Sequence, residues 1–344
     1  MTKVLHFTQS SGLGGVTDLS LDLIKYSKDF QFVVANYHND DRTEVEFREL
    51  GVEYHKEVSF DELREIIKTV DIVHAQPGAN AKCDSLDTAL SLGVPAIATV
   101  GTAGPIHRDY EGLVAVVAGS QSLLSKQPVG AKLIYHGVDI DRLQCADRRA
   151  AKKHWGLNPN QFVVGWMGRY IAFKCPGTTI GIAKRVQEVD SNIQFIMFGD
   201  KDGYEPAKEL AKELGAEVVF AGGTREKDLA YGAMDVGLFP TFGEAFGRVA
   251  AEMLGAEVPM ICSHCSTNVE IARDYAIYLP SPNYWNDNHK ADYHCQTWAH
   301  TILALLECEQ PRLDMAKAGK QRALDLFDAR IMAKKYNDLY RELA

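Results

Sequence analysis

The feature that most constrains the fold is a regular alternation of short β-rich runs with helical stretches. Between the first two runs, apolar residues recur with the spacing of one helix face (Val16, Leu19, Leu23 and Ile24). Such alternation predicts a parallel sheet with helices on both faces. The strands expected in the first half are 3–9, 30–38, 71–77, 95–101, 113–120 and 131–137.

The alternation restarts after a polar stretch at 141–161, which contains Gly156 and Pro159 near its end. We place a domain boundary in this stretch and expect an α/β chain of two Rossmann-like, doubly wound domains, 1–158 and 159–327, facing each other across a cleft. The strands expected in the second half are 162–169, 193–200, 216–223, 235–241 and 259–264, and the helices are about 175–189, 204–214, 225–233 and 246–256.

Charge and apolar content narrow the function classes. The 344 residues carry a net charge of −9, which argues against nucleic acid as the main partner. No apolar run approaches the roughly 20 residues that span a bilayer, and the N-terminus lacks a signal peptide, so we expect a cytoplasmic protein. The seven scattered cysteines indicate reduced thiols. Cys262 and Cys265 flank Ser263-His264, but no second ligand pair supports zinc.

In doubly wound sheets, ligands bind at the carboxyl ends of the strands, so the loops there are the candidate sites. The first such loop, 10–18, contains Gly12, Gly14 and Gly15. Their spacing is not G-x-G-x-x-G, which disfavours a nicotinamide oxidoreductase. A phosphate contact and a tight turn both remain open.

The loop at 167–177 carries Arg169 and Lys174 ahead of a helix expected to begin near Pro176. Two fixed cations beside a helix N-terminus can neutralise a diphosphate without a metal. The alternative is that both are solvated loop charges.

Two glutamates occupy the segment 239–259. Glu244 precedes a helix N-terminus, and Glu252 lies inside the same helix in a largely apolar run. A carboxylate in such a run needs a hydrogen-bonding partner, and a ribose diol would supply one. A capping glutamate and a surface glutamate are the alternative.

The segment "GEAFGRVAAE" (243–252) resembles the E-x7-E signature of retaining glycosyltransferases of family 4. Further segments resemble that family in order and spacing, although His136 stands in place of its usual Asn. They are 133–143, 162–174, 235–247 and 258–271.

The resemblance implies the GT-B fold, with a C-terminal helix at about 328–344 that crosses back onto the first domain. It also implies roles for residues in donor binding. Glu252 would bind the ribose, and Glu244 would lie near the donor sugar. The diphosphate would contact Arg169 and Lys174. Further donor contacts would come from the amides of Ala245, Phe246 and Gly247 and from the glycine loop at Gly14 and Gly15.

The chain departs from the family pattern at several positions. Gly101 stands where many members have a histidine, so His107 and His74 are candidates for contacting acceptor or sugar. A surface loop histidine and a satisfied core histidine are the respective alternatives. Ser266-Thr267 replaces the usual pair of glycines.

We therefore predict a retaining glycosyltransferase that uses a UDP-sugar, or next a GDP-sugar, and needs neither metal nor cofactor. The acceptor would be a glycan, a lipid-linked molecule or a small molecule. Asp200-Lys201-Asp202 imitates a metal-binding D-x-D but is interpreted as a turn. The basic stretch 148–155 leaves open a peripheral contact with the inner membrane face against a solvated helix face. The alternatives are another GT-B enzyme, such as a nucleotide-sugar epimerase, and a non-catalytic nucleotide-sugar-binding subunit.

Overall fold

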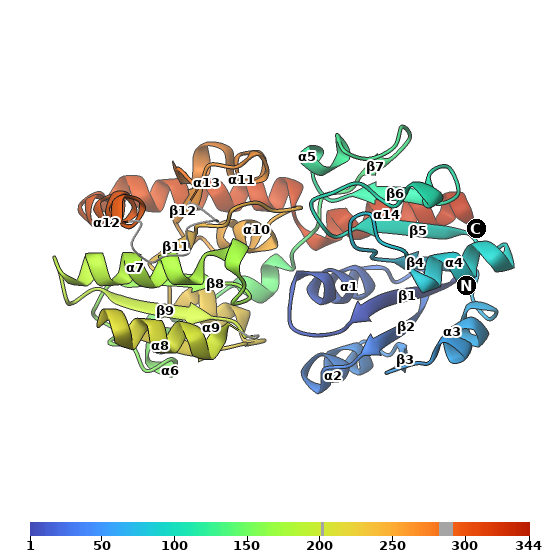
Figure 1. Cartoon of the computed structure of the whole chain (residues 1–344), viewed down its shortest axis with the longest axis horizontal. Coiled ribbons are helices and arrows are strands. Elements are labelled where there is room, and N and C mark those ends of the chain that lie inside the picture. Colours follow the sequence, from blue (N-terminus) through green and yellow to red (C-terminus); the bar gives the residue numbers. More distant parts are fainter. Residues whose placement is uncertain (201–202, 282–291) are drawn as a thin grey trace. The chain divides into compact units, whose positions relative to one another are not determined.

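The computed structural model describes residues 1–200, 203–281 and 292–344, which fall into two compact units (Figure 1). Unit 1 comprises Met1–Asp139 and Leu326–Ala344, and unit 2 comprises Ile140–Asp325. Each unit has one sheet in which all strand pairs are parallel. The α/β class predicted from the alternation is therefore confirmed.

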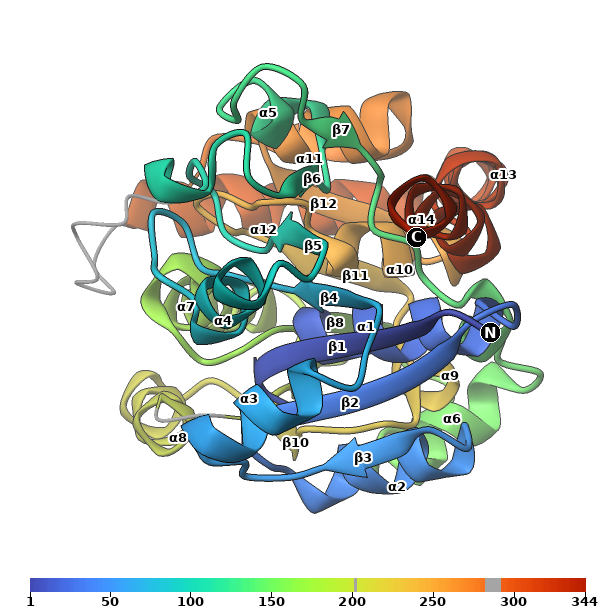
Figure 2. The same cartoon turned by 90° about the vertical axis from the view of Figure 1, so that its right-hand side faces the viewer.

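Unit 1 has a seven-stranded sheet in the order β3-β2-β1-β4-β5-β6-β7, which Figure 2 shows stacked from β3 at the bottom to β7 at the top. Its strands are β1 (Lys3–Ser10), β2 (Gln31–His38), β3 (Glu53–His55), β4 (Ile72–Ala75), β5 (Ala96–Val100), β6 (Ala115–Ala118) and β7 (Lys132–Leu133). Its helices are α1 (Gly15–Tyr26), α2 (Asp41–Glu49), α3 (Phe60–Ile67), α4 (Asp84–Leu92), α5 (Gln121–Leu124) and α14 (Ala329–Leu343), with a 3₁₀ turn at Arg108–Tyr110.

Local sequence explains where these helices begin and end. The Ser59 hydroxyl accepts from the Glu62 amide while the Glu62 carboxylate accepts from the Ser59 amide, so a capping box starts α3. Helix α4 ends at Gly93, which has a left-handed conformation (φ 72°) that glycine adopts without steric cost. The central strands are buried on both faces, as expected for a sheet covered by helices on either side.

The last helix completes the core of unit 1. Helix α14 packs against α1, and its Tyr336 and Tyr340 are fully buried. The Tyr340 hydroxyl lies 2.7 Å from His74 Nδ1, and the Tyr336 hydroxyl lies 2.6 Å from Thr99 Oγ1. The C-terminal residues therefore belong to the hydrophobic and polar core that the first 139 residues begin.

Unit 2 has a six-stranded sheet in the order β10-β9-β8-β11-β12-β13. Its strands are β8 (Val163–Met167), β9 (Gln194–Phe198), β10 (Val218–Gly222), β11 (Val236–Phe239), β12 (Met260–Ser263) and β13 (Ile277–Leu279). Its helices are α6 (Arg148–His154), α7 (Pro176–Gln187), α8 (Tyr204–Leu214), α9 (Lys227–Gly232), α10 (Arg248–Gly255), α11 (Ser266–Ala272), α12 (Asp292–Glu307) and α13 (Glu309–Leu326), with 3₁₀ turns at Ile140–Leu143, Ala172–Lys174 and Arg273–Tyr275.

The division differs from the sequence-based boundary at 158/159, because the structure places residues 140–158 in unit 2. Lys152 of α6 is 7% exposed, and its Nζ lies 2.6 Å from Asp235 Oδ2. A side chain on Gly232 of α9 would collide with Cys145, so α9 and this segment are in close contact. The polar composition that suggested a linker instead supplies these specific contacts.

Several strands also differ from expectation. The strand expected at 131–137 is only two residues long in β7, because the chain leaves the sheet edge after Ile134 toward the start of α14. Val138 N donates to Phe327 O at 2.7 Å there. The short edge strands β3 and β13 have no counterpart in the sequence-based prediction.

Candidate functional site

The sheet of unit 2 reverses its strand order between β8 and β11, which are neighbours although β9 and β10 separate them in sequence. Open parallel sheets bind ligands at the carboxyl ends of the strands beside such a point. The loops leaving β8 and β11 span residues 168–175 and 240–247. They carry Arg169, Lys174 and Glu244, which the sequence analysis selected.

Hydrogen bonds join these two loops. The Phe242 amide donates to the Phe173 carbonyl at 2.8 Å, and the Thr241 hydroxyl donates to the same carbonyl at 3.2 Å. From the strand below, Trp166 Nε1 donates to the Lys174 carbonyl at 3.3 Å. The backbone on both sides of the site is therefore fixed by the protein itself.

Lys174 and Glu244 form an ion pair across the two loops, in which Nζ donates to Oε1. Their side chains are 13% and 10% exposed. The Lys174 ammonium also lies 5.4 Å from the ring centroid of Phe239, and the Thr267 hydroxyl donates to the Glu244 carbonyl at 2.9 Å. Thr267, at a position where the family resembled above has glycine, thus holds the backbone of Glu244.

Arg169 lies on the same loop as Lys174, and its side chain is exposed. The structure thus places the two predicted phosphate-binding cations on one loop, but Lys174 turns toward Glu244 while Arg169 faces solvent. Their contact with a diphosphate remains a prediction.

Glu252 lies in the second turn of α10 and is 3% exposed. Its Oε2 accepts from the Tyr231 hydroxyl at 2.5 Å and from Lys227 Nζ at 3.1 Å. Nη2 of Arg248, one turn earlier in α10, lies 3.6 Å from Oε1. The apolar run around Glu252 predicted that this carboxylate needs a hydrogen-bonding partner, and the protein supplies donors of its own.

Lys227 and Tyr231 were missed by the sequence analysis. They lie four residues apart on one face of α9. This spacing is the sequence feature that places a lysine and a tyrosine together where both can donate to one glutamate. The contact between α9 and α10 cannot be read from the sequence, so the spacing alone did not identify Glu252 as the partner.

The N-terminus of α10 is built from the three residues predicted to supply amides. Gly247 has φ 81°, a left-handed conformation that permits the turn from Phe246 into the helix. Phe246 is buried, and Ala245 is partly exposed. The helix N-terminus carries partial positive charge, which favours an anionic group beside Glu244's loop. Contact of these amides with a ligand remains a prediction.

A second glycine-containing loop supports the loop after β8. An added Cβ on Gly199 would lie 1.8 Å from the Gly168 carbonyl oxygen, and one on Gly203 would lie 2.1 Å from the Tyr170 carbonyl oxygen. The Tyr170 amide donates to the Asp200 carbonyl at 3.2 Å. Lys201 and Asp202, the rest of the D-x-D-like motif, lie outside the described residues.

Two sequence motifs, Asp200-Lys201-Asp202 and Cys262-Ser263-His264-Cys265, resemble metal-binding motifs. Within residues 1–200, 203–281 and 292–344, no three His, Cys, Asp or Glu side chains gather in a way that could hold an ion. Burial raises the pKa of both the Cys262 and Cys265 thiols, which disfavours the thiolate forms that metals bind.

The glycine loop of unit 1 follows β1, next to the point where β1 and β4 are neighbours. Gly14 precedes α1, and Gly15 is its first residue. Ser11, which is fully buried, holds the base of this loop. Its Oγ accepts hydrogen bonds from the Tyr54 hydroxyl at 3.2 Å and from the Asp40 amide at 3.2 Å.

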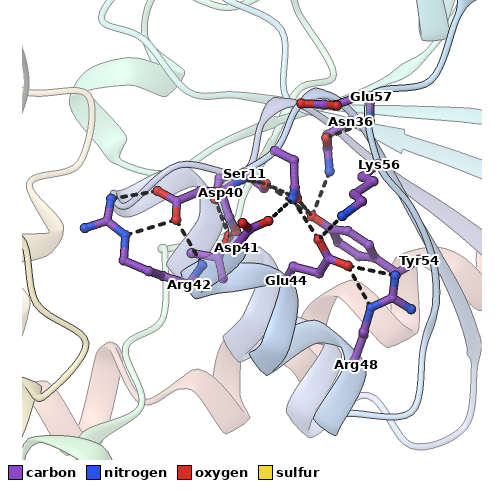
Figure 3. Close-up of polar contacts among 12 residues, drawn as sticks. Ser11, Asn36, Asp40, Asp41, Arg42, Glu44, Arg48, Tyr54, Lys56 and Glu57 are labelled. Atoms are coloured by element: carbon purple, nitrogen blue, oxygen red, sulfur yellow. Dashed lines mark hydrogen bonds and ion pairs between the residues drawn. The ribbon is translucent and has the colours of Figure 1, made fainter.

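Figure 3 shows the network around Ser11, with Asn36 directed toward the Tyr54 hydroxyl and Glu44 between two cations. Asn36 Nδ2 donates to the Tyr54 hydroxyl at 2.8 Å. Glu44 pairs with Arg48 at 2.8 Å and with Lys56 at 3.1 Å. The network ties β2, α2 and β3 to the first residue of the loop, so its polar groups stabilise the backbone there.

His74 is fully buried in β4. Its Nδ1 lies 2.7 Å from the Tyr340 hydroxyl and its Nε2 lies 2.8 Å from Thr99 Oγ1, so both ring nitrogens have partners in the core. This placement favours the core-histidine alternative over a contact with sugar.

His107 has a side chain that is 21% exposed, and its Nδ1 accepts from the Asp109 amide at 3.3 Å. It therefore caps the 3₁₀ turn that follows it. A role with the acceptor remains a prediction for this residue.

The basic stretch 148–155 forms α6, and part of its charge is directed inward. Lys152 and Arg148 both pair with Asp235, at 2.6 Å and 3.7 Å. His154 lies 3.3 Å from Glu226. Among the described residues, no helix is long and apolar enough to cross a membrane.

The chain resembles known glycosyltransferases in sequence. The family model described as Glycosyl transferases group 1 matches residues 147–322. D-inositol 3-phosphate glycosyltransferase of Mycobacterium sp. (strain KMS) is 29% identical over 194 residues, which are 54% of this chain and 41% of that protein. The chain thus aligns with less than half the length of that curated relative.

Solved structures resemble the whole chain. HepE of Anabaena, in complex with UDP and glucose, has a TM-score of 0.83 at 17% identity and covers 99% of this chain and 100% of its own. A glycosyltransferase from Rickettsia africae has a TM-score of 0.77 at 16% identity, covering 99% and 98%. The predicted GT-B fold class is confirmed by this likeness.

Proposed function

Because the chain belongs to the family Glycosyl transferases group 1, we propose that it transfers a sugar from a nucleoside diphosphate sugar to an acceptor hydroxyl with retention of anomeric configuration. UDP-sugars are the first candidate donors and GDP-sugars the second. The complex of HepE with UDP and glucose, a protein of the same fold, supports the order of these candidates.

One observation carries the proposal: the Lys174–Glu244 pair and the Glu252 cluster lie at opposite ends of one segment, at the strand-order reversal of unit 2. Glu244 precedes the N-terminus of α10, and Glu252 lies in its second turn. A nucleoside diphosphate has a matching order of groups, with phosphates for the cationic loop and helix N-terminus and ribose hydroxyls for the buried carboxylate.

The leaving diphosphate gains negative charge as its bond to the sugar breaks. Lys174, Arg169 and the N-terminus of α10 are positive groups beside the loops of this site, and they would stabilise that charge. Fixed donors of this kind contribute about 10²–10³ in rate each, as measured for oxyanion-hole donors.

In the proposed reaction the acceptor oxygen forms a bond to the anomeric carbon on the face that the diphosphate leaves. The bond between that carbon and the phosphate oxygen breaks, its electron pair goes to the diphosphate, and the departing oxygen takes the acceptor proton. Glu244 positions sugar hydroxyls, and Lys174 fixes its carboxylate. No step uses a metal or a cofactor.

The acceptor belongs to the proposal only as a class, a molecule with a hydroxyl group. The relative named above acts on an inositol phosphate by its name, so D-inositol 3-phosphate is one acceptor to test beside glycans and lipid-linked sugars.

The test is to incubate the protein with UDP-glucose and other UDP- and GDP-sugars and to measure release of the diphosphate with and without acceptors. Release that depends on acceptor, a product with the donor's anomeric configuration by proton NMR, and activity unchanged by EDTA are expected. Donor turnover at the same rate without acceptor, an inverted product, or no turnover with any donor would contradict the proposal.

A further inference from the structure

Tyr231 and Lys227 of α9 converge on one oxygen of Glu252. The Tyr231 hydroxyl donates to Oε2 at 2.5 Å, and Lys227 Nζ lies 3.1 Å from the same atom. A phenol hydroxyl on a carboxylate is a charge-assisted hydrogen bond, which is about twice as strong as a neutral one. Two donors on Oε2 fix both the rotamer and the plane of the carboxylate.

The two oxygens of Glu252 are therefore unequal. Oε1 lies 3.6 Å from Arg248 Nη2, which is beyond the usual distance of a hydrogen bond. A carboxylate oxygen can accept about two hydrogen bonds, so Oε1 keeps acceptor capacity while Oε2 is filled. Donors from a ligand would be received by Oε1.

Packing makes α9 a rigid support for this arrangement. Tyr231 is fully buried, and the side chains of Lys227 and Glu252 are 13% and 4% exposed. The neighbouring Gly232 packs so closely on Cys145 that an added Cβ would lie 2.3 Å from its sulfur.

The cluster also reaches the edge of the sheet at which the site lies. Lys227 Nζ is 3.5 Å from the sulfur of Met167, the last residue of β8, and the loop with Arg169 begins directly after it.

We propose that Tyr231 and Lys227 are positioning residues that hold Oε2 of Glu252 so that Oε1 receives the ribose hydroxyls of the nucleotide. The inference rests on the proposed function and deepens it. It makes this pair a determinant of preference for a ribonucleotide, because a carboxylate fixed in advance loses no rotamer freedom when the ribose binds. If the side chain were held by neither residue, the ribose contact would lose most of its strength.

The test uses UDP or GDP, whichever the protein binds more tightly, together with its 2′,3′-dideoxy analogue, and measures both dissociation constants by calorimetry. Hydrogen bonds to a charged group correspond to about tenfold to a hundredfold in affinity, so the wild-type protein should prefer the ribonucleotide by that ratio. Tyr231→Phe and Lys227→Met should each lower the ratio at least threefold, with the dideoxy analogue binding as before.

Matched controls are Tyr204→Phe, which removes a hydroxyl that donates to the Phe220 carbonyl at 3.0 Å, and Lys208→Met, which removes an exposed lysine of α8. Both should keep the wild-type ratio. A merely structural role of Tyr231 would weaken both ligands equally and leave the ratio unchanged, so the ratio separates positioning from folding. If Tyr231→Phe fails to fold, Lys227→Met supplies the same comparison.

The outcomes distinguish the inference from the proposed function. Wild-type protein that discriminates against the dideoxy analogue, with variants that discriminate equally well, overturns the inference and leaves the proposed function standing. Tight binding of both diphosphates without discrimination against either dideoxy analogue also overturns the inference. Wild-type protein that binds neither UDP nor GDP overturns both.

Discussion

Lys174 donates a hydrogen bond to Glu244 across 70 positions of sequence, from the loop after β8 to the loop after β11. Both side chains are nearly enclosed, so each charge depends on the other for its stability. The pair connects the backbone that would hold a diphosphate with the carboxylate that would hold a sugar. Its removal should therefore affect chemistry as well as folding.

Lys174→Met should lower the rate of sugar transfer by about 10²–10³, because it removes one fixed cation that stabilises the negative charge developing on the leaving group. The measurement is kcat with the best donor and acceptor at saturation. Lys212→Met is the matched control, since Lys212 pairs with Glu209 on the exposed face of α8. A kcat within threefold of wild type would remove Lys174 from the mechanism.

Gly199→Ala should displace the loop that carries Arg169. Gly199 has φ 141°, and an added Cβ would lie 1.8 Å from the Gly168 carbonyl oxygen, so backbone must move. We expect a loss of about 1–3 kcal/mol in the free energy of unfolding, as for other strained backbone positions, together with weaker binding of nucleoside diphosphate. Gly78→Ala is the control, because its Cβ would make an ordinary 3.6 Å contact with Ala81. Equal behaviour of the two variants would argue against a rigid contact between the loops.

Acid should destabilise unit 1 through His6. Burial lowers the pKa of His6 to about 3, and burial and the neighbouring His6 hold the pKa of His74 well below its usual value. An unfolded histidine has a pKa of about 6.5, so the unfolded state binds more protons as the pH falls below that value. The stabilisation is thus present above pH 6.5 and is lost between about pH 6.5 and 3.

Urea unfolding followed by circular dichroism at pH 6.5 and pH 5 measures this effect. His6 should account for about 2 kcal/mol of the difference between the two pH values. His6→Gln should be less stable than wild type at pH 6.5 but lose about that much less on acidification, while the exposed His38→Gln should behave as wild type. An identical acid loss in His6→Gln and wild type would refute the assignment.

Tyr340→Phe should destabilise the protein by about 1–3 kcal/mol, because it leaves Nδ1 of the fully buried His74 without its partner. Thermal unfolding measures the change. Tyr37→Phe is a suitable comparison, since its hydroxyl donates to Asp84 at the surface and its loss should cost little. If both variants melt at the same temperature, the contact of α14 with β4 contributes less than its burial suggests.

Local patterns were sufficient to predict much of the fold. The alternation of apolar strands with amphipathic helices predicts two parallel sheets, and the loops after two of their strands carry Lys174 and Glu244, with Glu252 in the helix that follows, as expected. These predictions succeed because side-chain periodicity and the residue types of a loop can be recognised from a few neighbouring positions. Contacts between residues far apart in the sequence were missed for the same reason.

Contacts between distant segments were not predictable in this way. Tyr231 and Glu252 meet only because α9 and α10 flank β11, and His74 meets Tyr340 across 266 positions. Residues 140–158 are polar enough to resemble a linker, yet Lys152 donates a hydrogen bond to Asp235 in unit 2. In each case the partner is chosen by tertiary packing, which a single segment of sequence does not specify.

The central claim is that unit 2 binds a nucleoside diphosphate with Glu252 on its ribose. Its most direct test is calorimetric titration of UDP and GDP into the wild-type protein and Glu252→Ala. Hydrogen bonds to a charged group correspond to about tenfold or more, so the account predicts binding by the wild-type protein that is at least tenfold weaker in the variant. Equal affinity of the folded variant and the wild-type protein would contradict it.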